Sequence, residues 1–325
     1  MRKLNENWQW SSTITVLLAV CCVLPFVLRP YQLDMMIFMF VYIMIVSSFR
    51  LISLTGEMSL AHAVIMGCGA YTSTLLYKYT GLSPWLSIPL GALAAALISF
   101  LLTFAIFRMK MFYFLIGSFA AAEAIRLCWL YFQGIFGGFR GIGRLPALEV
   151  DIPSVVYIDL GHPVNFYFFA LIVGVVVLVI LYRIEHSRFG LNFHATHWQD
   201  LLAGSVGVNC RSYRTIAFTV AGGFAGLAGG LLAHYVGAVN PQLYALGLML
   251  YILVWAIVGG LGHFAGPIIG VVVLSVIDEF ARSQQEFRPM IYGAILIATI
   301  LFLPDGLVSL PNRLKPIWNR IRGVD

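Results

Sequence analysis

Long apolar runs recur along the whole chain and constrain its fold more than any other feature. Charged residues make up 10% of the 325 positions and hydrophobic residues 60%, whereas about one-quarter of the residues in soluble domains are charged. A helix needs about 20 apolar residues to span the hydrocarbon core of a bilayer. We therefore predict an all-α polytopic membrane protein with a single transmembrane domain over residues 1–325. Its ten predicted spans, several of them short or interrupted by glycine, are 13–28, 33–53, 58–77, 84–107, 111–132, 164–182, 213–236, 245–258, 264–280 and 289–303.

The basic residues predict how these spans are oriented. Ten spans place both termini on one side of the membrane, and cytoplasmic loops carry an excess of Lys and Arg. With N- and C-termini in the cytoplasm, thirteen Lys and Arg residues lie inside and six outside, and Arg126 lies within a span. The net charge of +6 is dispersed, so we expect no nucleic-acid partner. The five cysteines lack metal-site spacing, and we expect no bound metal.

The first apolar run, 13–28, resembles a signal peptide because it follows Arg2 and Lys3. It ends in LRPYQLD without a small-residue cleavage pattern, so we expect it to be a retained span. The two longest polar intervals are predicted to be loops, an extracytoplasmic one at 133–163 and a cytoplasmic one at 183–212.

Two glycine-interrupted segments lie in opposite halves of the chain. They read GEMSLAHAVIMGCGAY at 56–71 and GGLGHFAGPIIG at 259–270. Paired interrupted segments of this kind indicate a possible inverted repeat with a binding path near the middle of the membrane. The alternative is close helix packing, since glycines also recur at every fourth residue in AGGFAGLAGG, at 221–230.

The first of these segments carries polar residues at the entrance to a span. Ser59 and His62 are three apart and would share a helix face, as a nucleophile and its base do. No third group that orients the histidine is evident. The alternative is that Gly56 breaks the backbone and that Glu57, Ser59 and His62 satisfy the exposed amide groups, with or without lining a polar path.

Glu123 and Arg126 form an opposite-charge pair three residues apart inside a predicted span. Ionisable groups at membrane depth are costly and usually face a bundle interior or an aqueous cavity. The pair is therefore predicted either to line a translocation path or to hold two helices together.

Both long loops contain candidate interaction residues. In the cytoplasmic loop, His194, His197 and Asp200 recur every third residue, which allows a metal site, but the pattern fits better with a short amphipathic helix that docks a partner. In the outer loop, the glycine- and arginine-rich stretch FGGFRGIGRLP (136–146) is either a receiver for a negatively charged group or a flexible turn region. No Gly-Lys dipeptide typical of a phosphate loop occurs, so ATP chemistry is expected on other polypeptides.

Several stretches taken together resemble the permeases of branched-chain amino acid ABC importers, and specifically their LivM-like subunit. The resemblance covers most of the chain in order, through GEMSLAHAVIMGCGAYTSTLL (56–76), AEAIR (122–126), SRFG (187–190), AGSVGVN (203–209), AFTVAGGFAGLAGGL (217–231), VGGLGHFAGPIIG (258–270) and FLPDGL (302–307).

The resemblance implies a permease subunit of the bacterial inner membrane that is not itself an enzyme and binds no cofactor. Its implied partners are a second homologous permease, two cytoplasmic ATPases that bind ATP, and an extracytoplasmic solute-binding protein, all assembled in membrane lipid. Coupling to the ATPases is implied for one set of residues in the cytoplasmic loop: Arg188, Phe189, Gly190, Ala195, Asp200, Ala203 and Gly207. Gly56, Glu57, Ser59 and His62 would form a polar break in a helix near the translocation path, with Glu123 and Arg126 as further path residues.

The chain departs from the family pattern at several positions. Relatives usually have Gln where Glu57 stands and Gly where Ala61 stands, and often carry several arginines where the coupling loop here has Leu191, His194 and His197. The outer Thr-Gly-Gly-x-x-Gly loop of the family appears here as FGGFRGIG, which keeps Gly137 and Gly138 but lacks the Thr and gains Arg140. The expected cargo is a small polar solute, first a branched-chain or related amino acid, with urea, short amides and aromatic acids as alternatives.

Two further function classes remain open from the residues alone. A secondary transporter or channel would explain the possible inverted repeat and the Glu123–Arg126 pair. A membrane-embedded hydrolase would use Ser59 and His62.

Overall fold

The computed structural model describes residues 21–109, 112–146, 148–152, 156–280, 282 and 287–310. Helices occupy nine of the ten predicted spans in this part of the chain, with ends that differ by a few residues from the prediction. They are α2 (Pro30–Ser53), α3 (His62–Thr80), α4 (Pro84–Ile106), α5 (Phe112–Tyr131), α7 (Pro163–Glu185), α10 (Cys210–Val236), α11 (Leu246–Gly259), α12 (Gly266–Phe280) and α13 (Arg288–Phe302). The first half of the remaining predicted span, 13–20, lies outside the described residues, and its second half contains the short 3-10 helix η1 (Leu24–Phe26).

Within the described residues, five helices are both long and apolar enough to cross a membrane by themselves: α2, α4, α5, α7 and α10. Proline stands at the start of α2, α4, α7 and α13, where its missing N–H costs no helical hydrogen bond. α3 stops at Gly81, which adopts the left-handed conformation with φ 66°. The prediction of an all-α polytopic membrane protein is confirmed.

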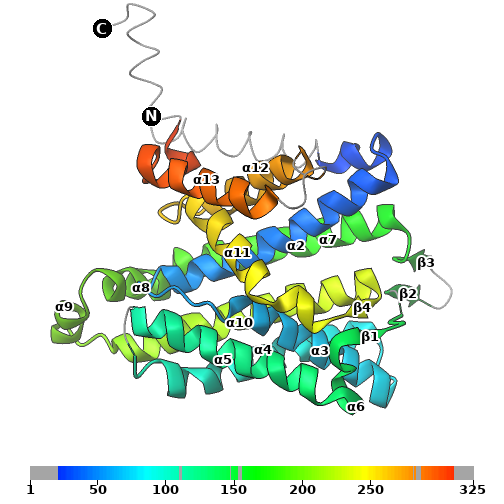
Figure 1. Cartoon of the computed structure of the whole chain (residues 1–325), viewed down its shortest axis with the longest axis horizontal. Helices are drawn as coiled ribbons and strands as arrows, with labels where there is room; N and C mark the ends of the chain where they lie inside the picture. Colours follow the sequence, from blue (N-terminus) through cyan, green and yellow to red (C-terminus); the bar gives the residue numbers. More distant parts are fainter. Residues whose placement is uncertain are drawn as a thin grey trace, which may run out of the picture.

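The connections gather at two opposite ends of the bundle (Figure 1). We call one end the α8 end, because α8 (Arg188–Trp198) and α9 (Asp200–Ser205) project there; the loops 54–61 and 260–265 lie at the same end. We call the other the strand end. It holds α6 (Gln133–Phe136), η2 (Gly138–Arg140), η3 (Pro241–Tyr244) and the strands β1 (Ile142–Gly143), β2 (Glu149–Ile152), β3 (Val156–Asp159) and β4 (Ala238–Val239). A last 3-10 turn, η5 (Leu307–Ser309), follows α13.

The four short strands were not predicted from the sequence. β2 and β3 form an antiparallel hairpin, and β1 pairs antiparallel with β4 through Ile142 opposite Val239. The second pairing joins the loop after α5 to the chain that follows α10. It arises from tertiary proximity, because two-residue strands have no periodic sequence signal.

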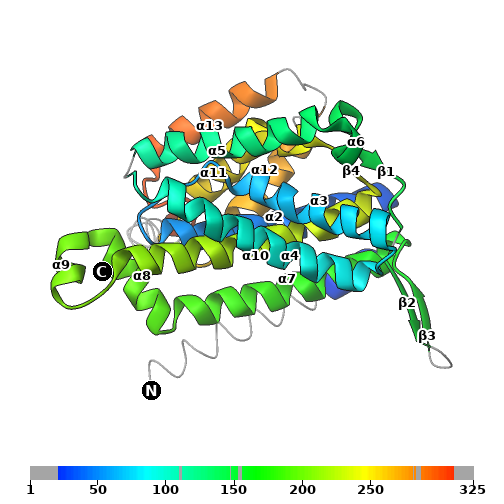
Figure 2. The same cartoon turned by 90° about the horizontal axis from the view of Figure 1, so that it is seen from below.

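The tightest packing joins α3, α4 and α10, which run side by side in both views (Figures 1 and 2). A Cβ atom at Gly69 of α3 would overlap the backbone of Gly226 in α10, and one at Gly229 would overlap the Met66 carbonyl. A Cβ at Gly91 of α4 would lie 2.6 Å from the Gly69 carbonyl oxygen. Small residues let membrane helices approach this closely, which explains the glycines of AGGFAGLAGG as packing residues.

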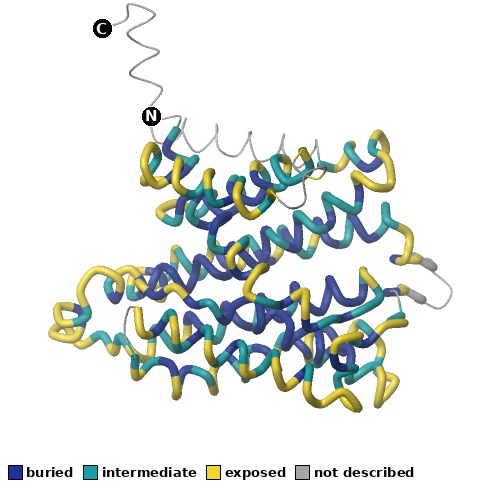
Figure 3. The backbone as a smooth tube through the Cα atoms, viewed as in Figure 1, coloured by how far each residue is buried: buried dark blue, intermediate teal, exposed yellow. Residues whose placement is uncertain are grey.

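Burial is greatest along α2, α3 and α10, which form the interior of the bundle (Figure 3). In the most apolar 18-residue stretch of α2, 78% of the residues are buried, whereas in that of α5 only 22% are buried. A large part of the α5 surface therefore faces out of the chain.

Candidate functional site

The segment with the polar residues Gly56 to His62 is a loop that joins two helices. α2 ends at Ser53 and α3 begins at His62. Gly56 has φ 84°, and a Cβ there would lie 3.3 Å from Cα of His197, at the C-terminal end of α8. The sequence predicted a break within a helix near the path; the structure instead has a connection between α2 and α3 at the α8 end. The positive φ of Gly56 lets the connection turn tightly, so that the loop lies against α8.

Ser59 and His62 serve separate hydrogen bonds. Oγ of Ser59 accepts from the Ala61 amide at 3.1 Å, and Nε2 of His62 is paired with Oγ of Ser48 on α2 at 2.9 Å. Both residues are completely buried. Among the described residues no hydrogen bond joins the two side chains, so the structure gives no support to the hydrolase alternative.

A cluster of three charged residues connects this loop to the segment that contains α8 and α9. Nη2 of Arg214, in α10, lies 2.9 Å from Oδ1 of Asp200, the first residue of α9. Nε of the same arginine lies 3.6 Å from Oε1 of Glu57. Only 15% of the Arg214 side chain and 5% of the Glu57 side chain are exposed. Enclosure by protein strengthens such charge interactions because solvent screens them less.

A second buried arginine crosses the same end of the bundle. Arg50 of α2 donates to both carboxylate oxygens of Glu185, the last residue of α7, and its Nε donates to the Leu261 carbonyl at 3.0 Å. The contact holds α2, α7 and the α11–α12 loop together. The sequence did not predict the ion pairs of Arg50, Glu185 and Arg214. Arg50 and Glu185 are 135 positions apart, and no periodic pattern links any of these residues to its partner.

The α8–α9 segment (residues 186–209) is anchored at its base and exposed at its tip. Oγ of Ser187 accepts from the Phe189 amide at 3.1 Å and caps α8. A Cβ at Gly190 would overlap the Glu185 carbonyl, which explains the glycine in SRFG. Large apolar side chains are exposed along this segment, with Leu201 91% exposed; the others are Phe189, Leu191, Trp198, Leu202 and Val206.

The residues predicted to couple to ATPases are all in this segment, with different environments. Arg188 and Phe189 are exposed, Gly190 and Ala203 are buried, and Ala195 is half-buried. Asp200 pairs with Arg214, and Gly207 turns the chain with φ 89°. The two histidines in the alternative metal site have other surroundings: Nδ1 of His197 bonds the Ser53 carbonyl at 3.2 Å, and burial lowers the pKa of His194.

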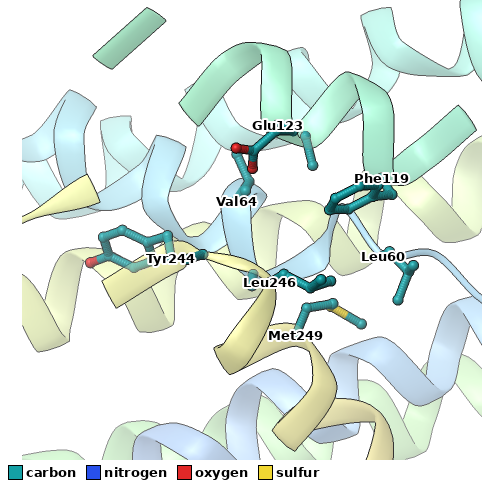
Figure 4. Close-up of a pocket in the computed structure, with 10 residues that line it drawn as sticks. Leu60, Val64, Phe119, Glu123, Tyr244, Leu246 and Met249 are labelled. Atoms are coloured by element: carbon teal, nitrogen blue, oxygen red, sulfur yellow. The ribbon is translucent and has the colours of Figure 1, made fainter. Parts of the chain in front are cut away.

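Glu123 lines a small pocket between α3, α5 and the start of α11 (Figure 4). The other lining residues are apolar or aromatic: Leu60, Ala63, Val64, Phe119, Ala122, Tyr244, Ala245, Leu246 and Met249. Oε2 of Glu123 accepts from Nε of Arg126 at 2.9 Å, so the predicted ion pair is present. The glutamate side chain is 30% exposed and the arginine 14%.

Tyr244, which lines this pocket, belongs to a group of packed aromatic side chains. Tyr71 stacks on Trp129 with ring centroids 4.6 Å apart, and Trp129 meets Tyr244 edge-on at 6.1 Å. Gly137 and Gly138 lie beyond them in left-handed conformations, next to the exposed Arg140. The structure therefore distributes the predicted residues over three places: Glu57 and the α8–α9 residues at the α8 end, Glu123 and Arg126 at the pocket, and the outer-loop residues at the strand end.

Several helices long and apolar enough to cross a membrane define a multi-pass membrane protein. The chain belongs to the family described as branched-chain amino acid transport system / permease component, which matches residues 31–302. The prediction of a LivM-like permease is confirmed.

Individual relatives are about one-quarter identical to the chain over the residues that align. The high-affinity branched-chain amino acid transport system permease protein LivM of Escherichia coli (strain K12) is 26% identical over 316 residues, which cover 91% of this chain and 74% of the relative. The probable branched-chain amino acid transport permease protein LivH of Methanocaldococcus jannaschii is 26% identical, over 74% of this chain and 79% of its own length. No solved structure matches the chain.

Proposed function

We propose that this chain is the permease subunit of an ATP-driven importer that carries a small polar solute, a branched-chain or related amino acid, into the cytoplasm. It would work in a bacterial inner membrane with a second homologous permease, two cytoplasmic ATPases and an extracytoplasmic solute-binding protein. ATP would bind only to the partners. The names of the relatives support the transport system, and the excess of basic residues in the predicted inner loops supports a cytoplasmic α8 end.

The observation that carries the proposal is the α8–α9 segment. It exposes a group of large apolar side chains outside the membrane-spanning helices, including Trp198, Leu201 and Leu202. Contiguous apolar groups on such a surface mark a protein interaction site. Two arginines hold the base of the segment: Arg214 of α10 pairs with Asp200, and Arg50 of α2 pairs with Glu185, directly before the segment. A displacement of the segment would therefore act on α2 and α10.

The pocket beside α5 supports a path for the solute. Glu123 and Arg126 are partly exposed on the least buried of the five long apolar helices. An ion pair at membrane depth is costly against lipid and needs water or another protein segment beside it. A path that runs between α5 and the second permease meets this need. Glu123 and the apolar lining residues of this small pocket would then border the path.

The test is reconstitution of the purified assembly in liposomes. We expect the chain to purify with two ATPases and a second permease, and uptake of branched-chain amino acids to require ATP and the binding protein. Leu201→Asp should remove ATPase binding, whereas Leu243→Asp, at an exposed leucine of the strand end, should not. Uptake by this chain alone, driven by an ion gradient and indifferent to ATP, would instead establish a secondary transporter.

A further inference from the structure

Arg214 lies between carboxylates from two different parts of the chain. Asp200 belongs to α9, in the projecting α8–α9 segment, and Glu57 belongs to the loop that joins α2 to α3. Arg214 itself is near the beginning of α10. A single guanidinium therefore connects the projecting segment to the loop at the base of the most buried helices.

The two contacts of this arginine differ in quality. The contact with Asp200 is a hydrogen-bonded ion pair at 2.9 Å. The contact with Glu57 measures 3.6 Å, beyond hydrogen-bond distance, and Nε of Arg214 is buried without a hydrogen-bond partner. A buried donor without a hydrogen-bond partner is unfavourable. A small displacement that brings Nε to about 2.9 Å from Glu57 would relieve this.

The surrounding contacts couple the same two segments. His197, at the end of α8, bonds the Ser53 carbonyl at the end of α2 at 3.2 Å, and Gly56 lies against the His197 backbone. The α2–α3 loop then leads directly into α3, whose residues Ala63 and Val64 line the Glu123 pocket. A displacement of the α8–α9 segment is thus transmitted over one loop to a wall of the pocket.

We infer that Arg214 is the positioning residue that couples movement of the α8–α9 segment to the α2–α3 loop, by strengthening its bond to Glu57 as its bond to Asp200 changes. The inference rests on the proposed function, in which ATPases move that segment. It assigns to Glu57 the role of receiving this movement, in addition to satisfying the loop.

The alternative is a purely structural cluster, in which the three charges only stabilise the fold. Buried ion pairs are retained in some proteins without a mechanical role, and removing one partner is destabilising in either case. Stability therefore cannot separate the two. The amount of solute transported per ATP hydrolysed can, because a stabilising cluster has no effect on that ratio once the assembly is formed.

The experiment uses the complete reconstituted importer and measures uptake, ATP hydrolysis and thermal stability of each variant. Glu57→Leu removes the acceptor at similar size, and Arg214→Met removes the donors. We expect each to keep ATP hydrolysis and to lower the transport-to-hydrolysis ratio about tenfold, a change of about 1.4 kcal/mol. The double variant should be no worse than Arg214→Met alone, since both substitutions remove the Arg214–Glu57 contact.

Conservative variants and a distant pair supply the controls. Glu57→Gln keeps an acceptor oxygen and should retain at least about half of the ratio, because the arginine can still donate to it. Asp278→Asn removes an ion pair with Arg288 at the strand end, 3.5 Å long, and should lower stability without changing the ratio. If Arg214→Met does not assemble, Arg214→Lys answers the question, since one ammonium group lacks the fork that spans two carboxylates.

The inference is overturned if Glu57→Leu and one of the two arginine variants, Arg214→Met or Arg214→Lys, each transport at least half as much solute per ATP hydrolysed as the wild type. It is also overturned if Asp278→Asn lowers this ratio as much as Glu57→Leu does. Failure of the proposed function is a separate result: the wild-type assembly itself would then show no ATP-dependent uptake.

Discussion

Nη2 of Arg50 lies 2.8 Å from Oε1 of Glu185, and the two side chains are only 3% and 11% exposed. The pair joins the end of α2 to the end of α7, directly before α8 begins. Its position makes it a clamp at the base of the α8–α9 segment.

Removing one member of this pair should destabilise the protein strongly. Glu185→Ala leaves Arg50 as a buried charge without its carboxylate, and we expect a loss of roughly 3–5 kcal/mol in the free energy of unfolding. The double variant Arg50→Met with Glu185→Leu should recover most of it, because apolar groups of similar size need no counter-charge. Denaturant unfolding in lipid nanodiscs measures both, and equal stability of Glu185→Ala and wild type would contradict the clamp.

The glycine contacts among α3, α4 and α10 should tolerate no side chain. Gly226→Ala places a methyl group against Ala95 and the backbone of α4, and overpacking of this kind costs about 1–3 kcal/mol. Gly293→Ala in α13 is the matched control, since a Cβ there meets nothing within 4 Å. Thermal unfolding of the two variants side by side gives the comparison; an unchanged Gly226→Ala would show that the helices are farther apart.

Glu123→Gln should lower transport, because it leaves Arg126 without an opposite charge beside the proposed path. We expect uptake to fall about tenfold or more, equivalent to at least about 1.4 kcal/mol. Glu279→Gln is the control: Glu279 also pairs with an arginine three residues away, Arg282, but at the exposed strand end. Wild-type uptake and stability in Glu123→Gln would remove the pair from the path.

Gly207→Asp should reduce transport while leaving the protein in the membrane. Gly207 has φ 89°, which other residues adopt at a cost of about 1–3 kcal/mol, yet a Cβ there meets no neighbour within 4 Å. The substitution therefore distorts the turn after α9 without disturbing the bundle. Gly204→Ala, a glycine of the same segment with equal space and no positive φ, should transport normally. ATP-dependent uptake with the ATPases measures both, and normal uptake by Gly207→Asp would contradict the coupling role of this turn.

The sequence was sufficient for the membrane helices and for the Glu123–Arg126 pair. Apolar runs near the length of a bilayer placed nine helices to within a few residues, because the requirement for internal hydrogen bonding leaves few other structures for them. The ion pair was found because its members are three apart and must lie on one face of α5.

The remaining site residues depended on contacts that leave no local pattern. Arg214 meets Glu57 and Asp200 only after α2, α9 and α10 have packed, and the sequence gives no spacing that links positions 57 and 214. The strands at the loop after α5 likewise follow from the position of β4 beside β1. Residues 58–61 were placed at the start of the predicted span 58–77 because they adjoin an apolar run, and only the fold shows that α3 begins at His62.

The interlocked backbones of α3, α4 and α10 have a mechanical consequence. Helices whose main chains touch at Gly69, Gly91 and Gly226 have no room to slide or rotate against one another, because interiors packed this closely do not deform continuously. We therefore expect these three helices to move as one rigid body in any change of conformation. The displacement has to occur at the joints around this body, at the short α2–α3 loop and at the looser contacts of α5, so the walls of the Glu123 pocket belong to parts that move differently.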